Sequence, residues 1–220
     1  MTNIISTNQA ATIFATALVE SIEKGLAAPF QDENSIQAVF TKYCIPYEKW
    51  SEFEQKRFSD QVRNGETVVH VIDREWTQGG PDPRVVRFSE VVALRVFHPN
   101  GNEELFEYKF DKGSKQFKVK TERGEKIPGI SEKRFAKEKS PIDSAVRGLQ
   151  EELKMDMSPA RIERDKKPNT FLFKPDERGF YVGLYVHNFV LQLNESDPIS
   201  DSYEEKQSSV YNQFRWESSL

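Results

Sequence analysis

Cysteine is nearly absent from this 220-residue sequence, in which Cys44 stands alone. A single cysteine cannot form an internal disulfide, which excludes the class of small disulfide-stapled domains and fits a reducing compartment. Free cysteines commonly pack as small apolar side chains. We therefore expect Cys44 to be buried.

Long apolar runs and an excess of basic residues are missing too. Apolar runs such as residues 180–186 are far shorter than the roughly 20 residues of a membrane-spanning helix. The first residues, MTNIISTNQ, lack the basic start and apolar block of a signal peptide. The net charge of −4 argues against broad nucleic-acid binding and against anionic membranes. We expect a cytoplasmic protein with no membrane partner.

Aromatic residues are plentiful, with 16 Phe, 7 Tyr and 3 Trp, and they supply enough apolar area for a packed core. Apolar side chains recur at helical spacing in three stretches before residue 65, namely 13–25, 36–40 and 50–62. Pro46 breaks the second stretch, and Asn64-Gly65 ends the third. We predict an N-terminal helical extension or cap over residues 1–65, followed by one domain over residues 66–220.

From residue 66 the apolar period changes to two, which is typical of strands. The predicted strands are 68–72, 85–97, 106–110, 117–119, 171–173, 180–193 and 210–216. Turns at Pro99-Asn100-Gly101 and Lys112-Gly113 predict an antiparallel meander with one wet face. Strands around one central helix predict an α+β fold, a mixed or antiparallel sheet sandwiched by helices.

The central helix is predicted from Ser140 to Met155. Ser140 suits the N-cap, and Pro141 suits the first helical position. One apolar stripe faces a core and consists of Ile142, Val146, Leu149 and Leu153.

Two adjacent carboxylates, Glu151 and Glu152, lie beyond the middle of this helix. Arg147 is one turn before Glu151, so the two can pair and Glu151 stays ionised. Mg²⁺ takes carboxylate, water and phosphate oxygens, so the pair can bind Mg²⁺ beside a diphosphate. The alternative is an ordinary solvated helix that happens to carry Arg-x-x-x-Glu-Glu.

The segment around the helix resembles the Nudix box. The family pattern is Gly, five residues, Glu, seven residues, then Arg-Glu-apolar-x-Glu-Glu-x-Gly-apolar. The matching positions hold Arg147, Leu149, Glu151, Glu152 and Met155. The turn Pro128-Gly129 and the late segments around residues 181–189, 203–207 and 211–216 also resemble parts of Nudix-like proteins. The resemblance covers roughly residues 85–216 and implies a Nudix-like fold.

The sequence departs from this pattern at key positions. Gly148 stands where the family has a metal-holding Glu, and Lys154 stands where it has a Gly. Lys139 replaces another family Glu, with Glu138 one position away. Losing one carboxylate of three removes a full negative charge from a site for a dication. Mg²⁺ nevertheless needs few protein ligands when phosphate supplies others.

Two functional hypotheses stay open. In the first, which the resemblance implies, the protein hydrolyses a nucleoside diphosphate linked to another group. Glu151, Glu152 and Glu138 then hold Mg²⁺ or Mn²⁺, and Arg147 orients Glu151. In the second, a catalytically degenerate module binds a nucleotide or a protein partner, and the N-terminal helices form an interaction surface or a homodimer interface. Gly148 favours the second hypothesis and the intact Glu pair favours the first.

Three further residues are candidates for nucleotide binding. Lys118 and Lys120 share one face of a predicted strand and can attract phosphate, although a solvated strand face is the simpler interpretation. His187 lies in an apolar strand, where a satisfied core residue is the simpler interpretation. The resemblance places that strand beside a ligand cleft.

Overall fold

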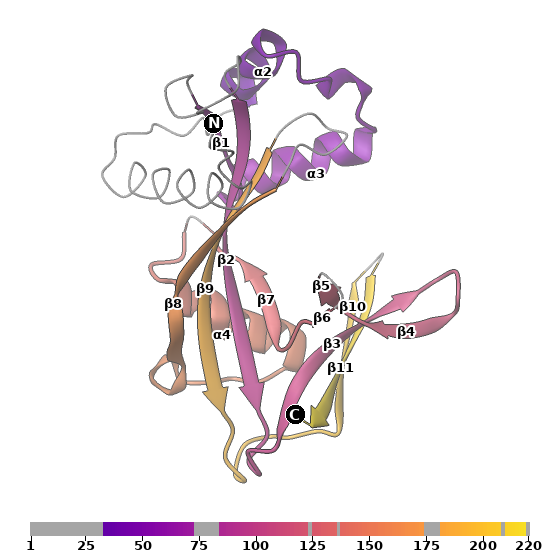
Figure 1. Cartoon of the computed structure of the whole chain (residues 1–220), viewed down its shortest axis with the longest axis vertical. Coiled ribbons are helices and arrows are strands. Elements are labelled where there is room, and N and C mark those ends of the chain that lie inside the picture. The colour runs from indigo at the N-terminus through magenta and orange to yellow at the C-terminus, as the bar shows by residue number, and fades with distance from the viewer. Residues whose placement is uncertain are drawn as a thin grey trace, which may run out of the picture. The chain divides into compact units, whose positions relative to one another are not determined.

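The computed structural model describes residues 33–72, 84–122, 125–135, 137–173, 181–207 and 210–218. Within these ranges the fold is α+β, as predicted, with three α-helices and an open sheet (Figure 1). The α-helices are α2 (Glu33–Lys42), α3 (Glu52–Arg63) and α4 (Pro141–Leu153). Short 3-10 turns are η1 (Tyr47–Lys49) and η3 (Pro159–Arg161). The predicted helix at 13–25 lies outside the described residues.

Nine strands of the described chain join in one sheet, in the order β10-β11-β3-β2-β9-β8. Strands β1 and β7 pair with β2, and β4 pairs with β3. The strands are β1 (Val68–Ile72), β2 (Arg84–Phe97), β3 (Glu103–Asp111), β4 (Gln116–Val119), β7 (Ile130–Lys133), β8 (Glu163–Phe173), β9 (Tyr181–Gln192), β10 (Ser202–Gln207) and β11 (Val210–Ser218). A separate hairpin joins β5 (Thr121–Glu122) to β6 (Glu125–Lys126).

The predicted strands are confirmed, although one was predicted too short and three, β5, β6 and β7, were not predicted. Strand β8 begins at Glu163, well before the predicted start at residue 171. Strand β7 falls in a charged stretch for which no strand was predicted. No helix of the described ranges is long and apolar enough to cross a membrane.

The described residues fall into two compact units, each with its own core. The first unit contains the chain up to Glu90, together with residues 133–137 and 168–186. The second contains residues 91–132, 138–167 and 187–220. The division into an extension over residues 1–65 and a domain over residues 66–220 stays a prediction.

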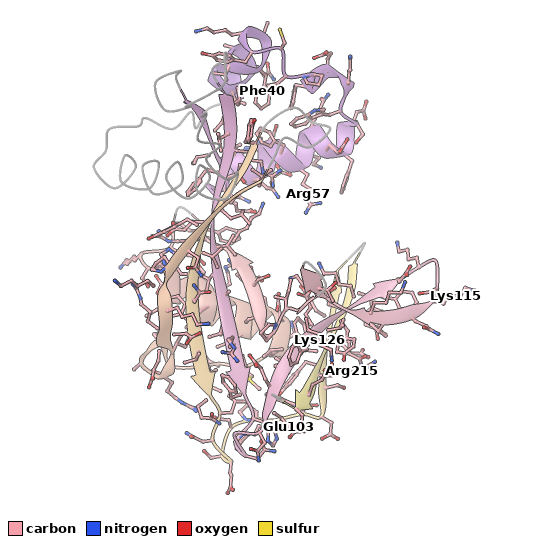
Figure 2. The ribbon with its side chains drawn as sticks, in the orientation of Figure 1. Phe40, Arg57, Glu103, Lys115, Lys126 and Arg215 are labelled. Atoms are coloured by element: carbon pink, nitrogen blue, oxygen red, sulfur yellow. The ribbon has the colours of Figure 1, made fainter. Side chains whose placement is uncertain are left out.

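Aromatic rings fill the core of the first unit. Phe40 of α2 lies at the centre of this cluster (Figure 2), with ring centroids 5.6 Å from Phe58 and 5.9 Å from Trp50. Helix α3 starts at a capping box, in which the Ser51 backbone N–H donates to the Glu54 carboxylate at 3.0 Å. The second and third predicted helices are thus confirmed as α2 and α3.

Cys44 is exposed, so the prediction that it is buried is wrong. Helix α2 ends in a tight turn in which Cys44 has a positive φ of 55°. The Cys44 N–H donates to the Thr41 carbonyl at 3.3 Å, and the Ile45 N–H donates to the Phe40 carbonyl at 2.9 Å. This Schellman arrangement turns Ile45 into the core and leaves the residue in the left-handed position outside.

Helix α4 packs on the sheet in the second unit (Figure 1). Leu149 and Leu153 of α4 are buried, and Ile142 and Val146 are partly buried against the same core. The sheet residues of this core include Leu94 on β2, Ile130 on β7, Phe189 on β9 and Phe214 on β11. The predicted apolar stripe therefore positions the polar side of the helix.

Candidate active site

The two ends of α4 fix its polar residues in place. Pro141 is the first helical residue, and the backbone N–H of Ser140 donates to the Asp143 carboxylate at 2.9 Å, so the predicted start is confirmed. The helix ends at Leu153, two residues before the predicted end at Met155, and its C-cap residue Lys154 has a positive φ of 59°. Lys154 thus adopts the left-handed conformation that suits glycine, the residue that the Nudix pattern has here.

Arg147 binds three carboxylates. Its Nε donates to Glu138 at 2.9 Å, and its Nη1 donates to Glu132 at 2.8 Å and to Glu151 at 3.1 Å. Burial alone would lower the pKa of Arg147, but the bonds to Glu138 and Glu132 raise it above its ordinary value. The predicted pairing of Arg147 with Glu151 is confirmed, and it belongs to a network that joins α4 to β7 and to the loop between them.

Glu152 is the most perturbed carboxylate that the structure describes. It is only 8% exposed, and burial, followed by the charge of Glu132, raises its pKa to about 10. The protonated carboxyl of Glu152 lies within hydrogen-bonding reach of Glu132, and this contact helps to raise the pKa of Glu152. Oε2 of Glu152 has no hydrogen-bond partner among the described residues. Burial raises the pKa of Glu132 as well, against the opposing effect of Arg147.

Two more carboxylates face Glu152 from the sheet, because the charges of Glu107 and Glu205 also raise its pKa. The register pairs Glu107 with Phe214 and Glu205 with Asn212, so both lie on the sheet face that α4 covers. Asn212 Nδ2 donates to Glu205 at 2.9 Å. The polar side of α4 is thus opposite a polar patch on β3, β10 and β11.

The two predicted lysines do not share a strand, because β4 ends at Val119, and they differ in their partners. Lys120 Nζ lies 2.6 Å from Glu107 Oε2 and 3.0 Å from Ser131 Oγ, which brings its ammonium to the carboxylate patch. Lys118 is mostly exposed and pairs with Asp111 near the tip of the β3–β4 hairpin, where Lys115 lies (Figure 2). Only Lys120 therefore joins the site.

The remaining predicted residues lie in three different settings. Glu138 is held by Arg147 and by Ser144 Oγ, which donates to it at 2.6 Å. Glu151 is half-exposed, while His187 is buried on β9 with its ring 6.5 Å from that of Phe189. Across the described ranges, no three His, Cys, Asp or Glu side chains are arranged to surround a metal ion.

Sequence reasoning missed Glu132, Glu107 and Glu205. For Glu107 a signal was present, because it follows Leu105 at the strand period of two and so shares the core face of an apolar strand. Glu132 gave no such signal, since β7 itself was not predicted. The carboxylate pair that the structure forms, Glu132 and Glu152, comes from two different elements.

Comparison with known proteins gives remote structural matches to this chain. No family model matches the sequence, and no curated protein matches it. Among solved structures, MutT from the psychrophilic fish pathogen Aliivibrio salmonicida and the mesophile Vibrio cholerae matches with 16% identity, a TM-score of 0.33 and coverage of 60% of this chain and 80% of that chain. The Ap4A hydrolase of C. elegans matches with 8% identity, a TM-score of 0.32 and the same coverage. A binary complex of that hydrolase gives 12% identity and a TM-score of 0.33 over 59% and 80% of the two chains. Such identities and TM-scores do not establish a family for this chain.

Proposed function

We propose that this protein is a Nudix-like hydrolase that cleaves a nucleoside diphosphate linked to another group, with Mg²⁺ or Mn²⁺ as cofactor. The observation that carries the proposal is Glu152, whose carboxylate is buried beside three others and has an oxygen without a donor. Burying a charge of this kind is costly unless a counter-charge accompanies it. A divalent cation supplies that counter-charge.

The donor set fits a hard cation of this kind. Mg²⁺ prefers oxygen ligands and is usually held by one or two carboxylates together with waters and the phosphates of the substrate. A pair such as Glu132 and Glu152 meets that need without a cage made only of protein ligands. When bound, Mg²⁺ neutralises diphosphate charge and activates water.

The other residues of the site have roles that follow from their contacts. Arg147 holds Glu132, Glu138 and Glu151 against α4, so the carboxylates keep one geometry. Lys120 is a half-buried cation that can release the Glu107 carboxylate and bind a phosphate oxygen in its place. In the reaction, water adds to one phosphorus and the bridging P–O bond breaks. Two phosphomonoesters leave, and the protons of the water pass to solvent.

A second candidate function is binding without hydrolysis. Gly148 supports it, because α4 itself offers one carboxylate fewer than the Nudix pattern. Glu151 supports it too, since its carboxylate is already bound by Arg147. In that case the chain is a module for a nucleotide or a protein partner, and its N-terminal helices form an interaction surface or a homodimer interface.

Purified protein incubated with ADP-ribose, nucleotide sugars or dinucleoside polyphosphates distinguishes the two functions, with products followed by chromatography. We expect cleavage that depends on Mg²⁺ and is lost in Glu152→Gln. Glu195→Gln removes an exposed carboxylate of the same unit and is the matched control, which should keep full activity. Nucleotide-dependent thermal stabilisation without cleavage would favour the binding module. No cleavage and no stabilisation by any of these compounds would refute both nucleotide functions.

A further inference from the structure

Gly148 leaves a space on α4 that another side chain enters. A Cβ built at residue 148 would lie 2.7 Å from Cγ of Glu132 and 3.1 Å from Cδ1 of Ile130. The nearest obstacles are thus side-chain atoms from β7. A side chain at position 148 and the present side chain of Glu132 therefore compete for one volume.

This volume lies beside Glu152. Residues four apart on a helix are neighbours on its surface, so a side chain from position 148 would lie next to that of Glu152. Glu132 reaches the same place from β7, and its carboxylate lies within hydrogen-bonding reach of Glu152. A carboxylate is therefore present where residue 148 would put one, although the helix does not carry it.

Arg147 fixes this carboxylate in position. Its Nη1 donates to Glu132 at 2.8 Å, and the side chain of Glu132 is only 18% exposed. Glu152 is more than nine-tenths buried, and its Oε2 has no donor among the described residues. One oriented carboxylate and one buried carboxylate with a free oxygen thus converge on one point, where a cation would satisfy both.

We propose that Glu132 supplies from β7 the carboxylate that α4 lacks at Gly148, and that Glu132 and Glu152 together bind the divalent cation that accompanies the diphosphate. The inference rests on the proposed function and adds a ligand to its site. The sequence of α4 has one carboxylate fewer than the Nudix pattern, and in the folded protein Glu132 of β7 places a carboxylate beside Gly148.

The test moves the carboxylate from the strand to the helix. The variants are Glu132→Gln, Glu132→Ala, Gly148→Glu and the double variant Glu132→Ala/Gly148→Glu. Mn²⁺ binding is measured by electron paramagnetic resonance, in the presence of a non-hydrolysable methylene analogue of ADP. Circular dichroism and thermal unfolding confirm that each variant is folded. Glu104→Gln is the matched control, because Glu104 is another buried strand glutamate of this unit that accepts hydrogen bonds from an arginine.

We expect Glu132→Gln and Glu132→Ala to weaken Mn²⁺ binding at least about tenfold, since loss of even an outer-shell partner of a metal typically costs that much. Gly148→Glu alone should weaken binding or lower the unfolding temperature, because two side chains then occupy one volume. The double variant should regain most of the affinity that Glu132→Ala loses. Folded Glu104→Gln should bind Mn²⁺ as the wild type does.

The outcomes separate this inference from the proposed function. If Glu132→Gln binds Mn²⁺ as the wild type does, the role of Glu132 is overturned and the proposed function is not. The same holds if the folded double variant binds Mn²⁺ no better than Glu132→Ala. A wild-type protein that binds no Mn²⁺ with or without the analogue overturns the proposed function together with this inference.

Discussion

Replacing Glu152 by Gln should stabilise the cation-free protein at neutral pH and above. Glutamine keeps the shape of the protonated carboxyl and carries no charge, so it removes the conflict with Glu132, Glu107 and Glu205. An ordinary buried and paired glutamate would respond in the opposite direction. The sign of the change therefore tests the electrostatic description of the site.

The size of the effect follows from the pKa of Glu152, which is raised from 4.5 to about 10. Between these values the folded protein binds more protons than the unfolded chain, so the free energy of unfolding falls as pH rises through this window. One pKa unit corresponds to about 1.36 kcal/mol, and pH 7 lies 7 − 4.5 = 2.5 units above the ordinary value. The largest possible gain in the free energy of unfolding at pH 7 is thus about 3 kcal/mol. Because the protonation of Glu152 is coupled to that of Glu132, we expect a gain of about 1–3 kcal/mol.

Urea unfolding in EDTA, followed by circular dichroism at pH 4.5, 7 and 9, measures this gain. The curves of the wild type and Glu152→Gln should nearly coincide at pH 4.5 and separate as pH rises. Glu104→Gln should instead lose about 1–3 kcal/mol at pH 7, because the Glu104 carboxylate accepts charged hydrogen bonds from Arg95 at 2.6 and 2.8 Å. A Glu152→Gln protein that is less stable than the wild type at pH 9, or a difference that does not change with pH, would refute the reasoning.

Four further predictions concern stability and exposure. Lys154→Gly should raise the free energy of unfolding by about 0.5–1 kcal/mol in urea, because glycine adopts the positive φ without strain; a loss would contradict this. Arg147→Met should lower it by about 2–3 kcal/mol, since carboxylates lose their partner, and an unchanged midpoint would show the network to be inert. Gly129→Ala should abolish soluble folded protein, because the new methyl overlaps a backbone carbonyl of β2, whereas Gly101→Ala, with positive φ and open space, should cost only about 1 kcal/mol. Cys44 should react with Ellman's reagent in the native protein, and a thiol that reacts only after unfolding would contradict its exposure.

Patterns that are local in the sequence predicted most of the fold. Strand β1 has the predicted limits, and α4 starts at Pro141 behind Ser140, because turn, cap and period signals each depend on neighbouring residues. Strand β7 was missed because it has one buried residue, Ile130, followed by three half-buried polar ones, so it shows no apolar alternation. The exposure of Cys44 depends on a left-handed turn that residue type alone does not indicate.

The site was less predictable, because chain order says little about which side chains meet. The ion pair of Arg147 and Glu151 was predictable, since both lie on one helix face. The partners of Glu152 come from β3, β7 and β10, and only the folded chain brings them together. Lys118 and Lys120 were equivalent in sequence and differ in the structure because only Lys120 lies opposite Glu107.

Strands β2, β8 and β9 each begin in one compact unit and end in the other. Each unit is therefore assembled from three separate stretches of chain. During synthesis, which proceeds from the N-terminus, the first unit stays incomplete until residue 186 has been made, and the second until β11 follows. While the later stretches are still being made, the nascent protein thus carries units that are not yet complete. No single cleavage of the chain would separate the two units, because stretches of one unit lie between stretches of the other.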